Sequence, residues 1–276
     1  MTFNDKFKEI CEAKNSRVCV GLDVDLNKIP SFLRDSDSPL FEFGKAIVDA
    51  TEKFVAAFKI NTAFFEAYGV AGWQALSKLV KYLPSNVIKI ADAKRADIGN
   101  TSRMYAQAFF QEMSFDAITI NPYLGYDGIA PFIENEEKGV FILCVTSNEG
   151  AIDFQHVNDG EHFLFEKVAI KTMHWNSKNN CGLVVGATHP TELKRVRSLA
   201  PNLPFLIPGI GAQGGELELA VKNTIIQSTS KAIFNSSRDI IYSSNEKNFA
   251  EVAAQKAIEL RDSINDTVDL IIPSKQ

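Results

Sequence analysis

The fold is decided by residues 87–99, which read VIKIADAKRADIG, an apolar run of strand length that ends in charged side chains. Residues two apart on a strand share a face, so the apolar face of this run ends in Asp92 and Lys94, with Asp97 just beyond the strand. Catalytic groups collect at the C-terminal strand ends of a parallel barrel. For an isolated Asp-x-Lys pair, a structural ion pair is the favoured interpretation, because buried charges must satisfy one another.

Seven other apolar runs of strand length alternate with longer amphipathic stretches of helical period. The eight predicted strands cover residues 17–23, 55–59, 87–92, 117–121, 140–145, 182–185, 205–208 and 231–234. The predicted helices include residues 40–53, 62–82, 101–113, 162–174, 190–199, 215–222 and 245–263. Strands that alternate with helices in this way indicate right-handed crossovers and a parallel sheet that is buried on both faces.

The length of the chain suits eight such units. Dividing 276 residues by eight gives about 34 residues for each strand and helix, which is typical of an α/β fold of the (β/α)8 TIM-barrel type. No Pro/Ser-rich linker or shift in composition divides the chain. Residues 1–276 are therefore predicted to form a single barrel domain, with the active site at the C-terminal ends of the strands.

A glycine-rich motif at residues 209–214, GIGAQG, would instead favour an open doubly wound sheet, because it matches the dinucleotide-binding pattern G-x-G-x-x-G. The motif follows the seventh predicted strand rather than the first, and the acidic residue expected about 20 positions later is absent around Phe234. The loops after strands seven and eight of a barrel commonly bind phosphate through backbone N–H groups. We favour a phosphate cradle here, and a glycine-rich turn without a ligand remains the alternative.

The charge balance excludes several classes of partner. The chain has 29 Lys and Arg against 34 Asp and Glu, which gives a formal net charge of -5 and argues against a general nucleic-acid or acidic-membrane surface. The N-terminus lacks the apolar core of a signal peptide, and the most apolar stretch, residues 139–145, is far shorter than the roughly 20 residues that span a bilayer. We expect a cytoplasmic protein with no nucleic-acid and no membrane partner.

The cysteines and histidines do not predict a metal site. The four cysteines are far apart and form no C-x-x-C motif, and most of them lie in or beside apolar strand-like runs, so they are expected to be buried packing residues. None of the four histidines has a metal-binding spacing. We expect neither a metal ion nor a cofactor.

Two neighbouring strands end in the same way as residues 87–92. The second predicted strand continues into Lys59 and Asn61 on one face, and the first ends at Asp23. Three adjacent strands would therefore deliver Asp23, Lys59, Asp92 and Lys94 to one rim of the barrel. An alternating array of this kind keeps each ammonium and each carboxylate ionised and can stabilise developing negative charge.

Residues 92–101, DAKRADIGNT, resemble the D-x-K-x-x-D signature of the orotidine 5′-phosphate decarboxylase family. The supporting matches are Asp23, Lys59, Thr146-Ser147-Asn148 after the fifth strand, PGIG at residues 208–211 after the seventh and Ser237-Arg238 after the eighth. The resemblance covers residues 17 to about 242. It points to the longer, type 2 subfamily, which has an extended segment after the fifth strand, here residues 148–160, predicted only as a loop.

Two alternatives remain open beside this resemblance. Sugar-phosphate enzymes of the same superfamily share D-x-K-x-x-D, but they use magnesium and a glutamate at the end of the second strand, where this chain has Lys59. A phosphate-binding module without catalytic activity would need only Arg238 and the glycine-rich loop.

The resemblance implies decarboxylation of orotidine 5′-phosphate to UMP and CO2, the last step of de novo pyrimidine nucleotide synthesis, without a metal or cofactor. Lys94 would stabilise the C6 carbanion and protonate it, beside Asp92 and Lys59. The implied substrate-binding residues are Asp23 and Asn61 for the ribose, Thr146 and Ser147 for the pyrimidine, and Pro208, Gly209, Gly211, Gln213 and Arg238 for the phosphate end. It also implies a homodimer in which Asp97, Ile98 and Thr101 reach the neighbouring subunit's site.

Overall fold

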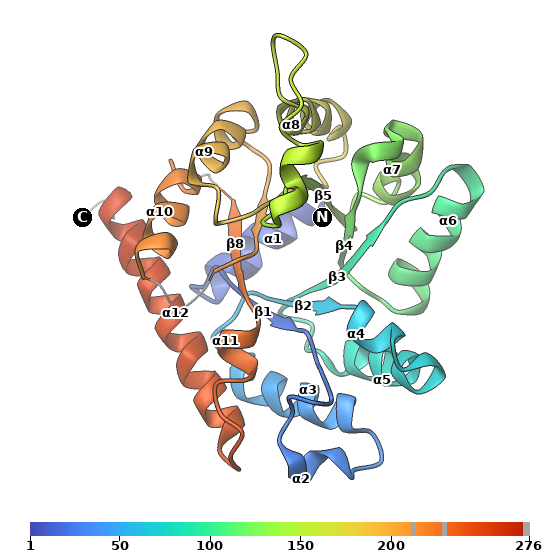
Figure 1. The fold of residues 1–276 in the computed structure, drawn as a ribbon, viewed down its shortest axis with the longest axis vertical. Helices are drawn as coiled ribbons and strands as arrows, with labels where there is room; N and C mark the ends of the chain where they lie inside the picture. Colours follow the sequence, from blue (N-terminus) through green and yellow to red (C-terminus); the bar gives the residue numbers. More distant parts are fainter. Residues whose placement is uncertain (211–213, 228–230, 273–276) are drawn as a thin grey trace.

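Eight short apolar segments of the chain pair side by side and close into a parallel barrel (Figure 1). The computed structural model describes residues 1–210, 214–227 and 231–272. The strands lie around the barrel in chain order and are β1 (Val18–Leu22), β2 (Ala57–Asn61), β3 (Ile88–Arg95), β4 (Ala117–Ile120), β5 (Gly139–Val145), β6 (Cys181–Val185), β7 (Phe205–Ile207) and β8 (Ala232–Ser236). The predicted barrel and its eight strands are confirmed, and the open doubly wound sheet is wrong because β8 pairs with β1.

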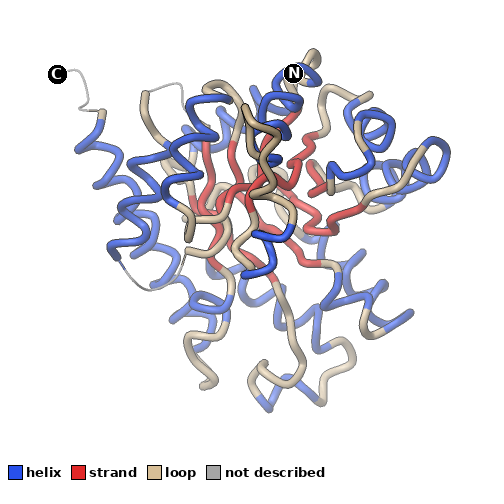
Figure 2. Tube along the Cα trace, turned by 45° about the horizontal axis from the view of Figure 1, so that its top comes forward, coloured by secondary structure: helices blue, strands red, loops and turns tan. Residues whose placement is uncertain are grey.

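Helices connect the strands and surround the barrel, as Figure 2 shows in blue around the red strands. They are α1 (Phe3–Ala13), α2 (Ser31–Arg34), α3 (Pro39–Thr51), α4 (Ala63–Glu66), α5 (Gly69–Tyr82), α6 (Gly99–Gln107), α7 (Tyr126–Ile133), α8 (Leu164–Trp175), α9 (Pro190–Leu199), α10 (Gly214–Thr224), α11 (Arg238–Ile241) and α12 (Phe249–Ile271). Within the described ranges, no helix has both the length and the apolar character needed to cross a bilayer.

Several helices differ from the prediction. The helix expected over residues 62–82 is two helices, α4 and α5, because Gly69 adopts a left-handed backbone with φ of 57° at the start of α5. The helix expected over residues 101–113 starts earlier as α6 and ends in a π-helical turn, Ala108–Glu112. The last helix was expected to end at residue 263 but continues to Ile271, because Ile264 and Thr267 are still buried against the rest of the protein.

The N-terminal end of the barrel is closed by α1, which the sequence analysis did not predict. Phe3 and Phe7 on α1 pack against Phe141 of β5, with ring centroids 5.9 Å and 6.4 Å from it. A side chain at Gly139 would not fit, since an added Cβ would lie 2.3 Å from the Phe3 ring. These residues and the lower interior of the strands form one apolar cluster. In Figure 1, α1 lies behind the strands, at the end of the barrel away from the viewer.

The four cysteines are free and buried, as the sequence predicts. Cys11 lies on α1, Cys19 on β1, Cys144 on β5 and Cys181 at the start of β6. Burial raises the pKa of the Cys11, Cys19 and Cys181 thiols to about 12. These groups therefore stay protonated at neutral pH and contribute packing.

Candidate active site

Four charged side chains meet at the C-terminal mouth of the barrel, as expected from the ends of the first three strands. Lys59 Nζ lies 2.8 Å from Asp92 Oδ2 and 3.9 Å from Asp23 Oδ1. Lys94 Nζ lies 2.5 Å from the other oxygen of Asp92, Oδ1. Asp92 thus accepts an ammonium on each oxygen, and Lys59 lies between two carboxylates. We call Asp23, Lys59, Asp92 and Lys94 the charged cluster.

The burial of the cluster increases from Lys94 inward. The Lys94 side chain is 50% exposed, whereas those of Asp92 and Lys59 are 11% and 5% exposed. Burial alone would raise the pKa of Asp92, but the ammonium groups of Lys59 and Lys94 outweigh it and hold that pKa well below its ordinary range. Burial likewise lowers the pKa of Lys59, but Asp92 and Asp23 outweigh it, so the net shift is upward. Asp92 and Lys59 are therefore both ionised at neutral pH.

Two adjoining cavities open from the cluster. One, of about 340 Å³, is lined by Lys94 together with Thr119, Leu143, Thr146, Asn148, Val184 and Leu206. The other, of about 410 Å³, is lined by Asp23 together with Gly209, Ile210, Asn235, Ser237, Arg238 and Asp239. Both are lined by Lys59, Asp92, Ser147 and Pro208. The cavities therefore meet at the cluster, and together they lead from the Lys94 ammonium to the Arg238 guanidinium.

The Arg238 end is built by the turns after β7 and β8. Gly209 has a φ of 88°, a left-handed conformation that favours glycine, and Arg238 is the first residue of α11. From the same turn, the Tyr242 hydroxyl donates to the Asp23 carbonyl at 2.8 Å and accepts from the Asp25 amide at 2.7 Å. Tyr242 thereby joins the Arg238 turn to the end of β1. The predicted phosphate residues Gly211 and Gln213 lie outside the described residues.

The remaining predicted residues do not join the cluster within this subunit. The Asn61 side chain accepts from the Ala63 amide at 3.2 Å, and the Asp97 carboxylate accepts from the Ile98 amide at 2.8 Å. In the described part of the chain, neither cavity is lined by these residues or by Thr101. Ile98 is 59% exposed. Among the described residues, the side chains of the β3–α6 turn therefore do not line the cavities of their own subunit.

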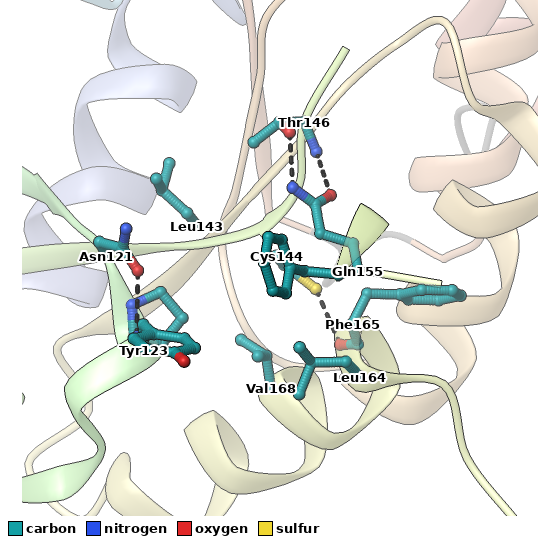
Figure 3. A pocket seen from close by; sticks show the side chains of 11 residues that line it. Asn121, Tyr123, Leu143, Cys144, Thr146, Gln155, Leu164, Phe165 and Val168 are labelled. Atoms are coloured by element: carbon teal, nitrogen blue, oxygen red, sulfur yellow. Dashed lines mark hydrogen bonds between the residues drawn. The ribbon is translucent and has the colours of Figure 1, made fainter. Parts of the chain in front are cut away.

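The segment after β5 was predicted only as a loop and contains a short 3-10 helix, Glu149–Asp153. It folds back so that Gln155 contacts Thr146, the residue directly after β5. The Gln155 side chain accepts from the Thr146 amide at 2.9 Å and donates to the Thr146 hydroxyl at 2.6 Å (Figure 3). These bonds lie beside a largely apolar pocket of about 650 Å³, lined by side chains such as Leu143, Phe165 and Val168. Leu143 and Thr146 also line the Lys94 cavity, so the two spaces share a wall.

Several side chains at the site were not identified from the sequence. They are Thr119, Gln155, Asn235 and Tyr242. Asparagine, serine and threonine near strand ends are too common to single out. The signal that marked the Arg238 turn was the Ser237-Arg238 pair after the eighth predicted strand, which the family resemblance singled out.

Residues that could hold a metal ion are not gathered at the mouth. Among residues 1–210, 214–227 and 231–272, no three His, Cys, Asp or Glu side chains have the arrangement of a metal site. The position between the carboxylates of Asp23 and Asp92 is taken by the Lys59 ammonium.

Comparison with known proteins gives consistent matches over nearly the whole chain. Residues 16–253 match the model of the orotidine 5′-phosphate decarboxylase / HUMPS family. An orotidine 5′-phosphate decarboxylase of Dehalococcoides mccartyi is 48% identical over 96% of this chain and 98% of its own length. One from Christiangramia forsetii is 47% identical over 93% of this chain and 95% of its own length. The solved structure of Leishmania donovani OMP decarboxylase matches with a TM-score of 0.85 at 37% identity, over 97% of this chain and 99% of that one.

Proposed function

The chain belongs to the orotidine 5′-phosphate decarboxylase / HUMPS family, and on that premise we propose that its charged cluster removes the carboxylate of orotidine 5′-phosphate to give UMP. The family resemblance found in the sequence is confirmed. The enzyme is a carboxy-lyase of pyrimidine nucleotide synthesis. The observation that carries our assignment of the site is the pair of cavities that join Lys94 to Arg238 across the charged cluster.

In the proposed reaction, the bond between C6 and the carboxylate breaks, CO2 leaves, and the electron pair stays at C6. The Lys94 ammonium stabilises this charge and then transfers a proton to C6, which gives UMP. Lys94 is suited to this role because it lines the cavity and is half exposed, so that its neutral amine regains a proton from water. Asp92 holds the Lys94 ammonium in place, and Lys59 pairs with the other oxygen of the same carboxylate.

The substrate would span both cavities. Arg238 is the partner for the phosphate, because a guanidinium can bind a phosphate through two parallel hydrogen bonds. Asp23 and Lys59, which line the Arg238 cavity, would bind the ribose. A ribose contact of Asn61 rests on the family resemblance alone, because Asn61 lines neither cavity in the described part of the chain. Thr146 and Ser147 would contact the pyrimidine, and Pro208, Gly209, Gly211 and Gln213 would complete the phosphate end. Binding energy from the phosphate, remote from C6, would contribute to orienting the reacting end.

We also propose that the reaction needs no metal ion or cofactor. Magnesium-dependent members of the superfamily would place an acid at the end of the second strand, and this chain has Lys59 there, between Asp23 and Asp92. The test is the absorbance of orotidine 5′-phosphate after the protein is added with a chelator. Loss of the orotate chromophore is expected. If the chromophore is lost only after magnesium is added, metal independence is contradicted. If it is not lost with either chelator or magnesium, the assigned reaction is contradicted.

The active unit is proposed to be a homodimer. In the described part of the chain, Asp97, Ile98 and Thr101 line neither cavity of their own subunit. Exposed apolar side chains on and beside α6 and α7 would be covered by a second copy. They are Ile98, Met104, Tyr123, Leu124 and Tyr126. Cytoplasmic location stays a prediction.

The shared site can be tested by mixing two inactive variants, Lys94→Ala and Asp97→Ala. If each site combines Lys94 of one subunit with Asp97 of the other, hybrid dimers contain one intact site, and partial activity returns. The measurement is turnover of orotidine 5′-phosphate after subunit exchange, which mass spectrometry verifies. No recovery after verified exchange would contradict the shared site.

A further inference from the structure

Thr119 on β4 is a buried polar residue that the proposed reaction does not use. It is 1% exposed and lines the Lys94 cavity beside the apolar side chains of Leu143, Val184 and Leu206. A hydroxyl in such surroundings is costly unless it is hydrogen-bonded. The contacts of its oxygen therefore show what holds it there.

The Thr119 hydroxyl makes two hydrogen bonds, and both go to residues of the charged cluster. Its oxygen donates to Asp92 Oδ1 at 3.1 Å and accepts from the Lys94 amide at 3.0 Å. The direction of each bond is determined, because an ionised carboxylate can only accept and a backbone amide can only donate. The single hydroxyl proton therefore points at Asp92, and a lone pair points at the backbone of Lys94.

The backbone of Lys94 needs such a partner. In the pairing of β3 with β4, Ala91 lies opposite Ile118 and Arg95 opposite Ile120, so three residues of β3, 92–94, bulge out opposite Thr119 alone. Lys94 has a φ of 47°, which is uncommon for any residue other than glycine. The Thr119 hydroxyl takes the place of a strand partner for the Lys94 amide and supports this backbone conformation.

The same hydroxyl fixes the Asp92 carboxylate. Oδ1 receives the Lys94 ammonium at 2.5 Å and the Thr119 hydroxyl at 3.1 Å, while Oδ2 receives Lys59 at 2.8 Å. Rotation of the carboxylate would break these contacts together. Thr119 thus bonds to the backbone amide of Lys94 and also to the Asp92 carboxylate, which in turn binds the Lys94 ammonium.

We propose that Thr119 is a positioning residue for the decarboxylation, which sets the geometry of Lys94 and Asp92 without binding substrate phosphate or ribose. This inference rests on the proposed function, because it assumes that Lys94 is the proton donor. Displacement of a reacting group by about 1 Å can reduce turnover by about 100-fold. Loss of the hydroxyl should therefore appear in kcat and not in KM.

The experiment compares Thr119→Val, which keeps the shape and removes the hydroxyl, with Thr119→Ser, which keeps the hydroxyl. We expect kcat for Thr119→Val to fall by about 10- to 100-fold, with KM and the affinity for UMP within about threefold of the wild type. Thr119→Ser should stay within about threefold in all three. The matched control is Thr51→Val on α3, where a buried threonine hydroxyl donates to the Ile47 carbonyl, away from the charged cluster, and kcat should not change.

All variants are assayed at a temperature at which circular dichroism shows each to be folded. A wild-type kcat for Thr119→Val would overturn the proposal. So would equal losses in Thr119→Val and Thr119→Ser, or a loss of UMP affinity that matches the loss of kcat. Failure of the proposed function would be separate, since it would appear as absent turnover by the wild-type protein.

Discussion

The two ends of the barrel are built from the same strands and differ in every other respect. At the N-terminal end, α1 covers the interior, and Phe3, Phe7 and Phe141 pack ring against ring. At the C-terminal end, the interior opens into cavities lined by the charged cluster. The change occurs within a single strand, since β3 begins with the apolar Ile88 and continues to Asp92 and Lys94.

In this fold, stability and chemistry are therefore placed at opposite ends of the same strands. The N-terminal end is stabilised by apolar burial, which a lost side chain weakens by leaving a void. The mouth is held by charges that satisfy one another, so a lost side chain there leaves a charge without its partner. Substitutions at the two ends should therefore change different measurements, and four predictions test that separation.

The largest effect is expected for Lys94→Ala at the mouth. Because it removes both the stabilising charge and the proton donor, turnover should fall by at least about 10⁴-fold. The melting temperature should change little, since Lys94 is half exposed and pairs only with Asp92 among the described residues. The measurements are loss of orotate absorbance and thermal unfolding. Activity retained above about 1% of the wild type would show that another group protonates C6.

The next effect is expected for Phe7→Ala at the closed end. It should lower the free energy of unfolding by about 3–5 kcal/mol, because it leaves a cavity among fully buried rings. Values of kcat and KM should stay at wild-type levels while the protein is folded. Urea unfolding measures the free energy, and steady-state kinetics measure kcat and KM. The control is Leu270→Ala, an exposed leucine on α12, which should stay within about 0.5 kcal/mol of the wild type. A loss of kcat in folded Phe7→Ala would show that the ends are coupled.

Arg238→Ala tests the far cavity of the mouth. We expect kcat/KM for orotidine 5′-phosphate to fall by about 100-fold, since a charge-assisted hydrogen-bonded contact to the phosphate is worth about 1.5–3 kcal/mol. Turnover of orotidine, which lacks the phosphate, should not change. Arg34→Ala, an exposed arginine on α2, is the control. Equal losses with both substrates would place the role of Arg238 elsewhere than at the phosphate.

The smallest effect concerns acid stability. The folded-state pKa of Asp92 is held below its ordinary value of 3.8, so its stabilisation is complete above that pH and is lost as the pH falls below it. The pKa of Lys59 is raised above 10.5, so its contribution is complete below that pH and is lost as the pH rises through the folded-state value. Below about pH 4 the unfolding free energy of the wild type should therefore fall faster than that of Asp92→Asn, by up to about 1.4 kcal/mol per pH unit. Parallel curves in urea titrations would contradict this.

The strands and the charged cluster could be predicted from the sequence because their signals are local. Each strand is an apolar run between polar turns, and Asp92 and Lys94 follow directly from such a run. The position of α1 could not be predicted in this way. Its apolar residues pack against the lower interior of the barrel, which exists only after all eight strands have closed.

The unpredicted parts of the site depend on contacts between distant segments. Thr119 is an ordinary strand residue by composition, and its importance comes from a bulge in the neighbouring strand. Gln155 acts on Thr146 only because the segment between them folds back. Among the described residues, Asp97, Ile98 and Thr101 line neither cavity of their own subunit, so their proposed role needs a second copy.

The four buried cysteines are natural probes of how the barrel opens. One thiol lies on the helix that covers the N-terminal end and three lie on strands of the ring itself, and alkylating reagents attack only the exposed thiolate. Each thiol is therefore modified only as fast as its own element opens. The order of labelling under native conditions would report whether α1 leaves the barrel before the ring of strands separates, with no introduced probe.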